Sequence, residues 1–294
     1  MELRGIIPPM TTPFTERGEV YEAGLRRLVE FQIEKGSHGL FICGTYGSGP
    51  IMTLEQRKLV HEIVVDQARG RIAVVAHVGT ASTQEAVELA RHAEGVGIEY
   101  VASIPPYYFH HDDRAVVEYF RALVKSVGIP VYVYNNPKTA YVNVTPKLLR
   151  NLVEVGVQGI KDSGFSYIDF THLVLALEDR PGFRFIVGTE GIALPAFMAG
   201  AKGCVSGLAN AFPEIMVELW NLFQAGKYEE AAKLQLKVNK ARLVLHIPSS
   251  TNAACYAALN ARGVDVGIPK APVLPVEKEK EAAMLAGFRE LGLL

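Results

Sequence analysis

A lysine and a tyrosine, Lys161 and Tyr134, each stand at the end of a short apolar run and could carry covalent chemistry together. An amine in a desolvated place is neutral for part of the time and can attack the carbon of a ketone. A nearby phenol could supply and remove the protons that this condensation needs. The alternative is an ordinary lysine at the end of a strand with its ammonium group in solvent, because lysine is rarely buried without a partner.

Short apolar runs rich in β-branched residues recur between longer amphipathic segments. This alternation predicts parallel strands that are joined by crossover helices. Three helix starts are well marked, by capping-box sequences that begin at Thr53 and Ser82 and by the pair Thr145–Pro146. Eight runs can be counted, and we expect strands at residues 5–7, 39–43, 72–78, 100–104, 131–134, 159–161, 185–188 and 203–206.

Eight strand–helix units predict a (β/α)8 barrel, an α/β fold of ~250 residues whose active site lies at the carboxyl ends of the strands. A doubly wound open sheet is the alternative, but no strand leads into the glycine spacing of a dinucleotide site. We place a barrel catalytic domain at residues 1–211 and a C-terminal helical extension at residues 212–294. In the extension we expect helices at residues 213–225, 227–245 and 249–261, and then an irregular link into a solvated helix that begins at residues 277–281.

The barrel topology brings the residues that follow the strands to one mouth. Thr45 and Tyr46 follow the second strand, Tyr108 the fourth and Gly188 the seventh, while Lys161 ends the sixth. A lysine inside this mouth would be desolvated, which lowers its pKa and favours a Schiff base. The protonated imine withdraws electrons, so that a carbon–carbon bond one position away breaks or forms through an enamine.

The segment Gly44–Gly47 allows two interpretations. It is either a tight turn and no more, or a set of successive backbone N–H groups that could cradle a carboxylate. It is not a phosphate-binding P-loop, because no Gly-Lys-Ser or Gly-Lys-Thr follows it.

Composition excludes several classes of partner. A chain of 294 residues with 49% hydrophobic residues allows one large core, and a net charge of −1 with dispersed Lys and Arg argues against nucleic acid and anionic membranes. Cys43, Cys204 and Cys255 lack pairing or metal-type spacing, so we interpret them as reduced core residues. We interpret His110–Asp112 as loop surface and predict no metal and no cofactor. Without a membrane-length apolar stretch or a signal-peptide pattern, the expected location is cytoplasmic.

Six ordered motifs resemble the N-acetylneuraminate lyase and dihydrodipicolinate synthase superfamily, class I aldolases that form a Schiff base with pyruvate. They lie at residues 9–14, 44–47, 106–108, 134–137, 159–162 and 200–203, and the match covers nearly the whole chain. The resemblance implies Lys161 as the Schiff-base lysine and Tyr134 as the phenol that transfers protons. It also implies a hydroxyl relay completed by Thr45 and Tyr108, with Tyr108 reaching into a neighbouring subunit's site. Family members are usually homotetramers built as dimers of dimers.

Departures from the family pattern bear on the substrate. The turn Gly47–Pro50 and the pair Lys161–Asp162 resemble the archaeal 2-keto-3-deoxygluconate aldolases. Lys138 stands where synthases place an arginine for the aldehyde's carboxylate, and lysine lacks the bidentate fork. Tyr46 replaces the second threonine of the family's pair, and relatives that hydrate and cleave aromatic substrates also have an aromatic residue there. Asn136 stands where sugar-acid aldolases often have tyrosine.

The sequence therefore predicts a lyase that cleaves or forms a carbon–carbon bond next to pyruvate, with pyruvate and a small aldehyde or 2-keto acid as ligands. The expected substrate is 2-keto-3-deoxygluconate. The alternatives are a 4-hydroxy-tetrahydrodipicolinate synthase that uses aspartate semialdehyde, a hydratase-aldolase, a keto-sugar-acid dehydratase, or a relative that binds a keto acid without turnover. The candidate substrate-binding residues are Tyr46, Asn136, Lys138, Ser163, Gly188 and Val205.

Overall fold

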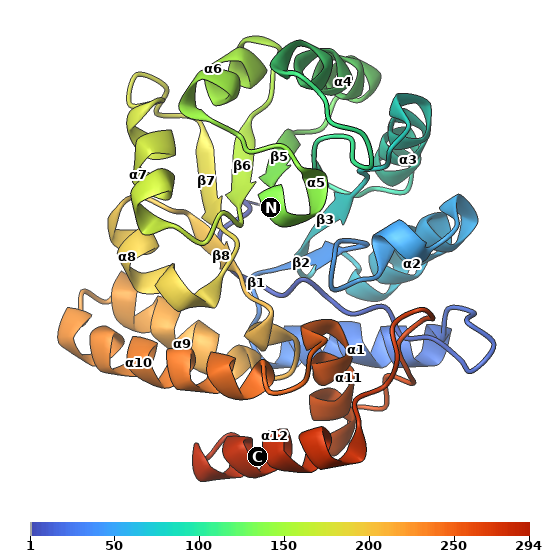
Figure 1. Ribbon diagram of the computed structural model, residues 1–294, viewed down its shortest axis with the longest axis vertical. Coiled ribbons are helices and arrows are strands. Elements are labelled where there is room, and N and C mark those ends of the chain that lie inside the picture. Colours follow the sequence, from blue (N-terminus) through green and yellow to red (C-terminus); the bar gives the residue numbers. More distant parts are fainter. Residues whose placement is uncertain (1) are drawn as a thin grey trace.

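The computed structural model describes residues 2–294, in which eight parallel strands alternate with helices (Figure 1). Each strand lies where the sequence pattern predicts it, and its ends differ from the prediction by at most one residue. The strands are β1 (Gly5–Ile7), β2 (Gly39–Ile42), β3 (Ala73–His77), β4 (Tyr100–Ser103), β5 (Val131–Asn135), β6 (Gly159–Asp162), β7 (Arg184–Val187) and β8 (Gly203–Val205).

Helices cover the outer side of this sheet (Figure 1). Two of them, α5 and α6, follow β5, and short 3₁₀ turns at residues 49–51, 190–192 and 208–210 follow β2, β7 and β8. The first nine helices are α1 (Glu22–Glu34), α2 (Leu54–Ala68), α3 (Thr83–Gly95), α4 (Asp113–Ser126), α5 (Pro137–Ala140), α6 (Pro146–Glu154), α7 (Tyr167–Leu175), α8 (Ala193–Met198) and α9 (Pro213–Gln224).

The sheet closes on itself through its first strand. On one side β1 pairs in parallel with β8, with Ile6 opposite Cys204. On the other side the His38 N–H donates to the Ile6 carbonyl (2.8 Å), and the Phe41 N–H donates to the Pro8 carbonyl (3.0 Å). The fold is therefore the predicted (β/α)8 barrel, and the doubly wound open sheet is wrong.

Two apolar layers stabilise the barrel. Successive side chains of a strand point to opposite faces, so Ile7 packs in a small cluster inside the barrel while Ile6 packs in a larger cluster beneath the helices. The inner cluster also contains Phe41, Val75 and Ile186. This packed interior supports the carboxyl ends of the strands from below.

The marked helix starts are confirmed, with one difference in detail. At α2 the Thr53 hydroxyl accepts from the Gln56 N–H (3.2 Å), and the Gln56 side chain accepts from the Thr53 N–H (3.3 Å), which completes the capping box. At α3 only half of the box forms. The Ser82 hydroxyl accepts from the Glu85 N–H (3.4 Å), but the Ser82 N–H donates to Thr80 Oγ1 (3.0 Å) instead of the glutamate. A local turn thus competes successfully for that donor.

The C-terminal extension continues with α10 (Tyr228–Leu245), α11 (Thr251–Ala261) and α12 (Lys278–Glu290), close to the predicted ranges. Figure 1 shows α10 and α12 along one side of the barrel. The expectation of a merely solvated last helix is wrong, because Met284 and Phe288 are fully buried. The Phe288 ring packs against Phe212, with 4.5 Å between ring centroids. The domain boundary after residue 211 stays a prediction, and α9 packs on both β1 and α10.

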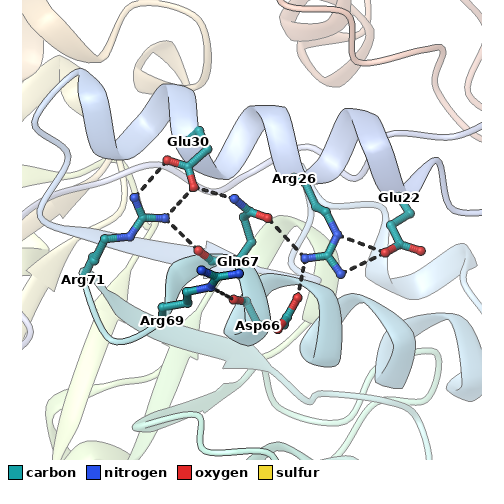
Figure 2. A network of polar contacts seen from close by, with 7 residues as sticks. All are labelled: Glu22, Arg26, Glu30, Asp66, Gln67, Arg69 and Arg71. Atoms are coloured by element: carbon teal, nitrogen blue, oxygen red, sulfur yellow. Dashed lines mark hydrogen bonds and ion pairs between the residues drawn. The ribbon is translucent and has the colours of Figure 1, made fainter.

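A network of charged side chains joins α1 to the end of α2 (Figure 2). The Arg71 guanidinium binds the Glu30 carboxylate, which also accepts from Gln67. One turn earlier in α1, Arg26 binds Asp66 and donates to the Gln67 side chain (3.2 Å). These contacts fix the two helices against each other on the solvent side.

Candidate active site

Lys161 and Tyr134 lie side by side in the barrel. They are partners in the parallel register of β5 and β6, and each is 4% exposed. The Lys161 Nζ atom lies 3.7 Å from the centroid of the Tyr134 ring and 4.0 Å from that of Phe41. The interpretation of Lys161 as a solvated strand-end lysine is therefore wrong.

The environment changes the acidity of both groups. Burial lowers the pKa of the Lys161 amine, and the Tyr134 phenol opposes this shift only in part. Burial would raise the pKa of Tyr134, but the Lys161 charge and hydrogen bonds with Thr45 and Ser163 outweigh burial and hold that pKa below its ordinary value. Burial therefore favours the neutral amine of Lys161, and a charged Lys161 favours the phenolate of Tyr134.

The Tyr134 hydroxyl is the centre of a polar cluster. Thr45, Ser163 and Lys161 hydrogen-bond with it, and the Asn136 side-chain amide donates to it at 3.1 Å. The Ser163 hydroxyl in turn donates to the Gly188 carbonyl (3.2 Å). A proton could therefore pass between the lysine, the phenol and a hydroxyl group without leaving the cavity.

The Tyr46 ring lies across the end of β8. A Cβ atom at Gly207 would come within 2.4 Å of the Tyr46 hydroxyl, so only glycine leaves room for the ring there. Thr251 of α11 hydrogen-bonds with the Tyr46 hydroxyl, and burial raises the pKa of that phenol, which keeps it protonated. The ring that replaces the family's second threonine thus forms one wall of the cavity.

A cavity of about 220 Å³ opens above these groups. Nine of the ten predicted site residues line it: Thr45, Tyr46, Tyr134, Asn136, Lys138, Lys161, Ser163, Gly188 and Val205. The structure thus brings together both predicted reactive groups and all six predicted substrate-binding residues. Their individual roles stay predictions.

Tyr108 is the predicted site residue that does not line this cavity. Its side chain is 78% exposed, and its ring packs edge-on against Phe109, with 5.0 Å between centroids. Its backbone has φ +83°, a left-handed conformation that is unusual for a residue other than glycine. Within one chain, Tyr108 therefore does not take part in the polar cluster around Tyr134.

Other lining residues come from places that the sequence did not mark. Arg242 and His246 belong to α10 or directly follow it, and Thr251 begins α11. The strand-end rule cannot find them, because they follow the last strand. Phe165 and Thr139 also line the cavity, close in sequence to the predicted residues Ser163 and Lys138.

Glu190 and Arg242 form an ion pair at the cavity wall, with 3.3 Å between Glu190 Oε1 and Arg242 Nε. The other Glu190 oxygen accepts from the Ser206 hydroxyl and from the Gly207 N–H, each at 3.1 Å. Because the carboxylate is 4% exposed, these partners compensate its burial. The pair joins the end of β8 to the C-terminal extension.

The rest of the described chain adds few candidate groups. Within residues 2–294, no three His, Cys, Asp or Glu side chains gather in a way that could hold a metal ion, and the three cysteines are free and buried. His110 packs against Tyr141, with 5.5 Å between ring centroids. Each helix of that part of the chain is too short or too polar to span a bilayer.

The barrel and its buried lysine define a class of enzyme, the (β/α)8 lyases that act through a lysine Schiff base. A model of the dihydrodipicolinate synthetase family matches residues 2–289, and the chain belongs to this family. Its members are class I aldolases that act on pyruvate together with an aldehyde or keto acid.

Three known proteins illustrate the relationship. The 4-hydroxy-tetrahydrodipicolinate synthase of Methanothrix thermoacetophila is 34% identical over 283 residues, which cover 96% of this chain and 94% of that protein. YagE, a prophage protein of the dihydrodipicolinic acid synthase family from E. coli K12, was solved with pyruvate; it superposes with a TM-score of 0.96 at 25% identity over the whole of both chains. A catalytic-lysine mutant of the Ruminococcus gnavus sialic acid aldolase gives 0.93 at 27% identity, covering 98% of this chain and 95% of its own.

Proposed function

We propose that this enzyme cleaves and forms 2-keto-3-deoxygluconate, with pyruvate and glyceraldehyde as the other partners, and that Lys161 is its Schiff-base lysine. The observation that supports the assignment of the lysine is its burial beside Tyr134 at the floor of a 220 Å³ cavity. An amine with a lowered pKa can attack the 2-keto group of the substrate.

In the cleavage direction, the Lys161 amine replaces the ketone oxygen as an imine, and water leaves. Tyr134 takes the proton from the hydroxyl on the carbon that departs as aldehyde, while the bonding electrons pass into the protonated imine as an enamine. Protonation of the enamine carbon and hydrolysis then release pyruvate and restore the amine. Thr45 and Ser163 hold the Tyr134 hydroxyl during these transfers.

The lining of the cavity supports a substrate with several hydroxyl groups. The hydroxyls of Thr139, Thr189 and Thr251 and the amide of Asn136 lie around it. These groups can both donate and accept hydrogen bonds, as a sugar chain does.

A synthase that condenses pyruvate with aspartate semialdehyde is the second candidate. Relatives at about 30% identity carry that name, including the one from Methanothrix. The Lys138 ammonium lies at the cavity over the Phe165 ring, with 4.7 Å from Nζ to the centroid, and could attract the carboxylate of the semialdehyde. A single amine lacks the two-pronged contact of arginine, so we rank this candidate second.

We further propose that the enzyme is a homotetramer and that Tyr108 of one subunit completes the hydroxyl relay of another. The exposed, strained Tyr108 favours this arrangement, because an aromatic side chain in such a conformation is stabilised by a partner surface. One result of the test below would point to dehydration of related sugar acids by the same imine.

The test measures pyruvate release from 2-keto-3-deoxygluconate with a coupled lactate dehydrogenase. The wild-type protein should release pyruvate, and Lys161→Ala should abolish both this release and the borohydride-dependent labelling of the protein by pyruvate. Lys202→Ala, an exposed lysine at the opposite end of β8, is the matched control and should keep both.

Three results would change the conclusion. Pyruvate labelling that survives in Lys161→Ala refutes the assigned lysine. Labelling of the wild type without release from the sugar acid moves the substrate to aspartate semialdehyde, to an aromatic substrate or to a dehydration reaction. Absence of labelling in the wild type supports a protein that binds keto acids without covalent chemistry.

A further inference from the structure

The first turn of α11 reaches the turn that follows β2. The side-chain amide of Asn252 donates to the Tyr46 carbonyl (2.6 Å) and lies within 3.3 Å of the Thr45 carbonyl and 3.4 Å of the Ser48 hydroxyl. More than two hundred residues separate Asn252 from this turn in the sequence. The C-terminal extension therefore contacts the backbone of the cavity wall itself.

The contacted turn has an uncommon backbone. Cys43 and Ser48 have φ values of +57° and +58°, which side chains other than glycine rarely adopt. At Gly49 a Cβ atom would lie 1.8 Å from the Cys43 carbonyl oxygen, so the chain there is folded tightly on itself. Such conformations persist where the surrounding structure holds them in place.

The Asn252 amide helps to fix where two peptide units point, together with the Ser48 N–H, which donates to the Thr45 carbonyl at 3.3 Å. In a trans peptide the carbonyl and the following N–H point in opposite directions. A Thr45 carbonyl held toward α11 therefore turns the Tyr46 N–H away from α11, and the Tyr46 carbonyl does the same to the Gly47 N–H. Within residues 2–294 neither N–H has a hydrogen-bond acceptor. Tyr46 lines the cavity and Gly47 directly follows it, and two neighbouring free donors are suited to a carboxylate.

The orientation of Asn252 has a cost in the folded protein. Its side-chain oxygen is buried and has no hydrogen-bond partner in the described part of the chain. An unsatisfied buried acceptor destabilises a protein. Docking of α11 does not require this side chain, because other contacts hold the helix. The Tyr256 hydroxyl donates to the Thr12 carbonyl (2.6 Å), and the residues from Ala253 through Cys255 are buried. The contact with the turn is what Asn252 contributes.

We propose that Asn252 is a positioning residue: it holds the Thr45–Tyr46 carbonyls so that the N–H groups of Tyr46 and Gly47 bind the carboxylate of pyruvate. This proposal rests on the function proposed above. It predicts that the affinity for pyruvate depends on a side chain that does not itself touch the substrate.

The experiment measures the pyruvate concentration that gives half-maximal borohydride labelling of Lys161, which requires no knowledge of the aldehyde. Asn252→Ala should raise this concentration at least about tenfold and still reach full labelling at saturation. Asn252→Asp, which has the same shape but presents oxygens to the carbonyls, should raise it further. Ser250→Ala, which removes the N-terminal cap of α11 without touching the turn, is the matched control.

The control should lower the melting temperature and leave pyruvate affinity unchanged. An Asn252→Ala protein that labels with the wild-type concentration dependence overturns the role of Asn252 while the proposed function stands. A rise in Ser250→Ala equal to that in Asn252→Ala also overturns it, because the effect would then be general loosening of α11. If Lys161→Ala is labelled, or the wild type is not, the proposed function fails and this proposal with it.

Discussion

The Tyr134 hydroxyl has a stabilising partner in both of its protonation states. The Asn136 amide donates to it at 3.1 Å, and the Lys161 amine, when charged, stabilises the phenolate. Tyr134→Phe removes the hydroxyl that we propose as the proton carrier and keeps the ring that packs against Lys161. We expect kcat for pyruvate release to fall roughly a hundredfold or more, the magnitude of lost general acid–base catalysis. Borohydride labelling at saturating pyruvate should persist. An unchanged kcat would contradict the assigned role.

The pH dependence of labelling reports the acidity of Lys161. Its pKa is lowered by burial, so the rate of imine formation should rise with pH and reach its plateau below the ordinary value of 10.5. The Tyr134 phenol raises this pKa in part, and Tyr134→Phe should therefore move the rising limb to still lower pH. A limb near 10.5 would show that the amine is solvated in solution.

At the scale of residues, the sequence identifies the site residues that stand at strand ends and misses those that do not. Lys161 and Tyr134 can be found because an apolar strand delivers each of them to the mouth. Arg242 and Thr251 cannot be found in this way, since they belong to helices after the last strand and reach the cavity only through tertiary packing. The polar–apolar pattern of a helix does not say which barrel end it will meet.

At the scale of elements, the network between α1 and α2 offers a measurable contribution to stability. Hydrogen bonds from Arg71 and then Gln67 lower the pKa of Glu30 to about 2. Glu30→Gln should lower the free energy of unfolding by about 0.2–1 kcal/mol, a modest effect because the pair is partly exposed and screened by salt. Denaturation in urea at low and high salt measures it.

The sign of the pH dependence of this contribution follows from the lowered pKa of Glu30. A carboxylate that ionises more easily in the folded state stabilises the protein above its unfolded pKa of about 4.5 and loses this effect as pH falls toward about 2. The difference between wild type and Glu30→Gln should shrink over that range. Glu16→Gln, at an exposed loop position, is the control. A difference that is independent of both salt and pH would contradict the electrostatic origin.

Element types and positions follow from periodicity, and their finer contacts do not. The strand ranges are predicted to within a residue because β-branched runs are short and bounded by glycine, proline or polar turns. Only half of the predicted Ser82 capping box forms, because the nearby Thr80 hydroxyl accepts the hydrogen bond from the Ser82 N–H. The burial of α12 is missed since its charged residues outnumber the two side chains that pack, Met284 and Phe288.

At the scale of the molecule, α12 contributes to a core that includes the end of the barrel. Phe288 is fully buried against Phe212, which directly precedes α9. Phe288→Ala should lower the free energy of unfolding by about 3–5 kcal/mol, as expected for removal of a buried aromatic ring. Leu274→Ala, at a side chain that is 74% exposed, should change it by less than about 0.5 kcal/mol. Urea unfolding compares the two variants.

Equal effects of the two substitutions would show that α12 is not packed in solution.

The (β/α)8 architecture itself can be read from the chain, because eight alternating units admit few other topologies. The proposed association of subunits cannot be read in this way, since the pattern does not distinguish the exposed side chains of Tyr108 and Phe109 from those of other loop residues.

The hydrogen bonds from Asn252 to Thr45 and Tyr46 also order events in time. Ribosomes make the β2 turn early, and the side chain that holds it emerges more than two hundred residues later. If the proposed role of Asn252 is right, a nascent chain can assemble its strands before its carboxylate cradle has its final shape. Full affinity for pyruvate would then be acquired only near the end of translation, and a chain that stops short of residue 252 would lack it.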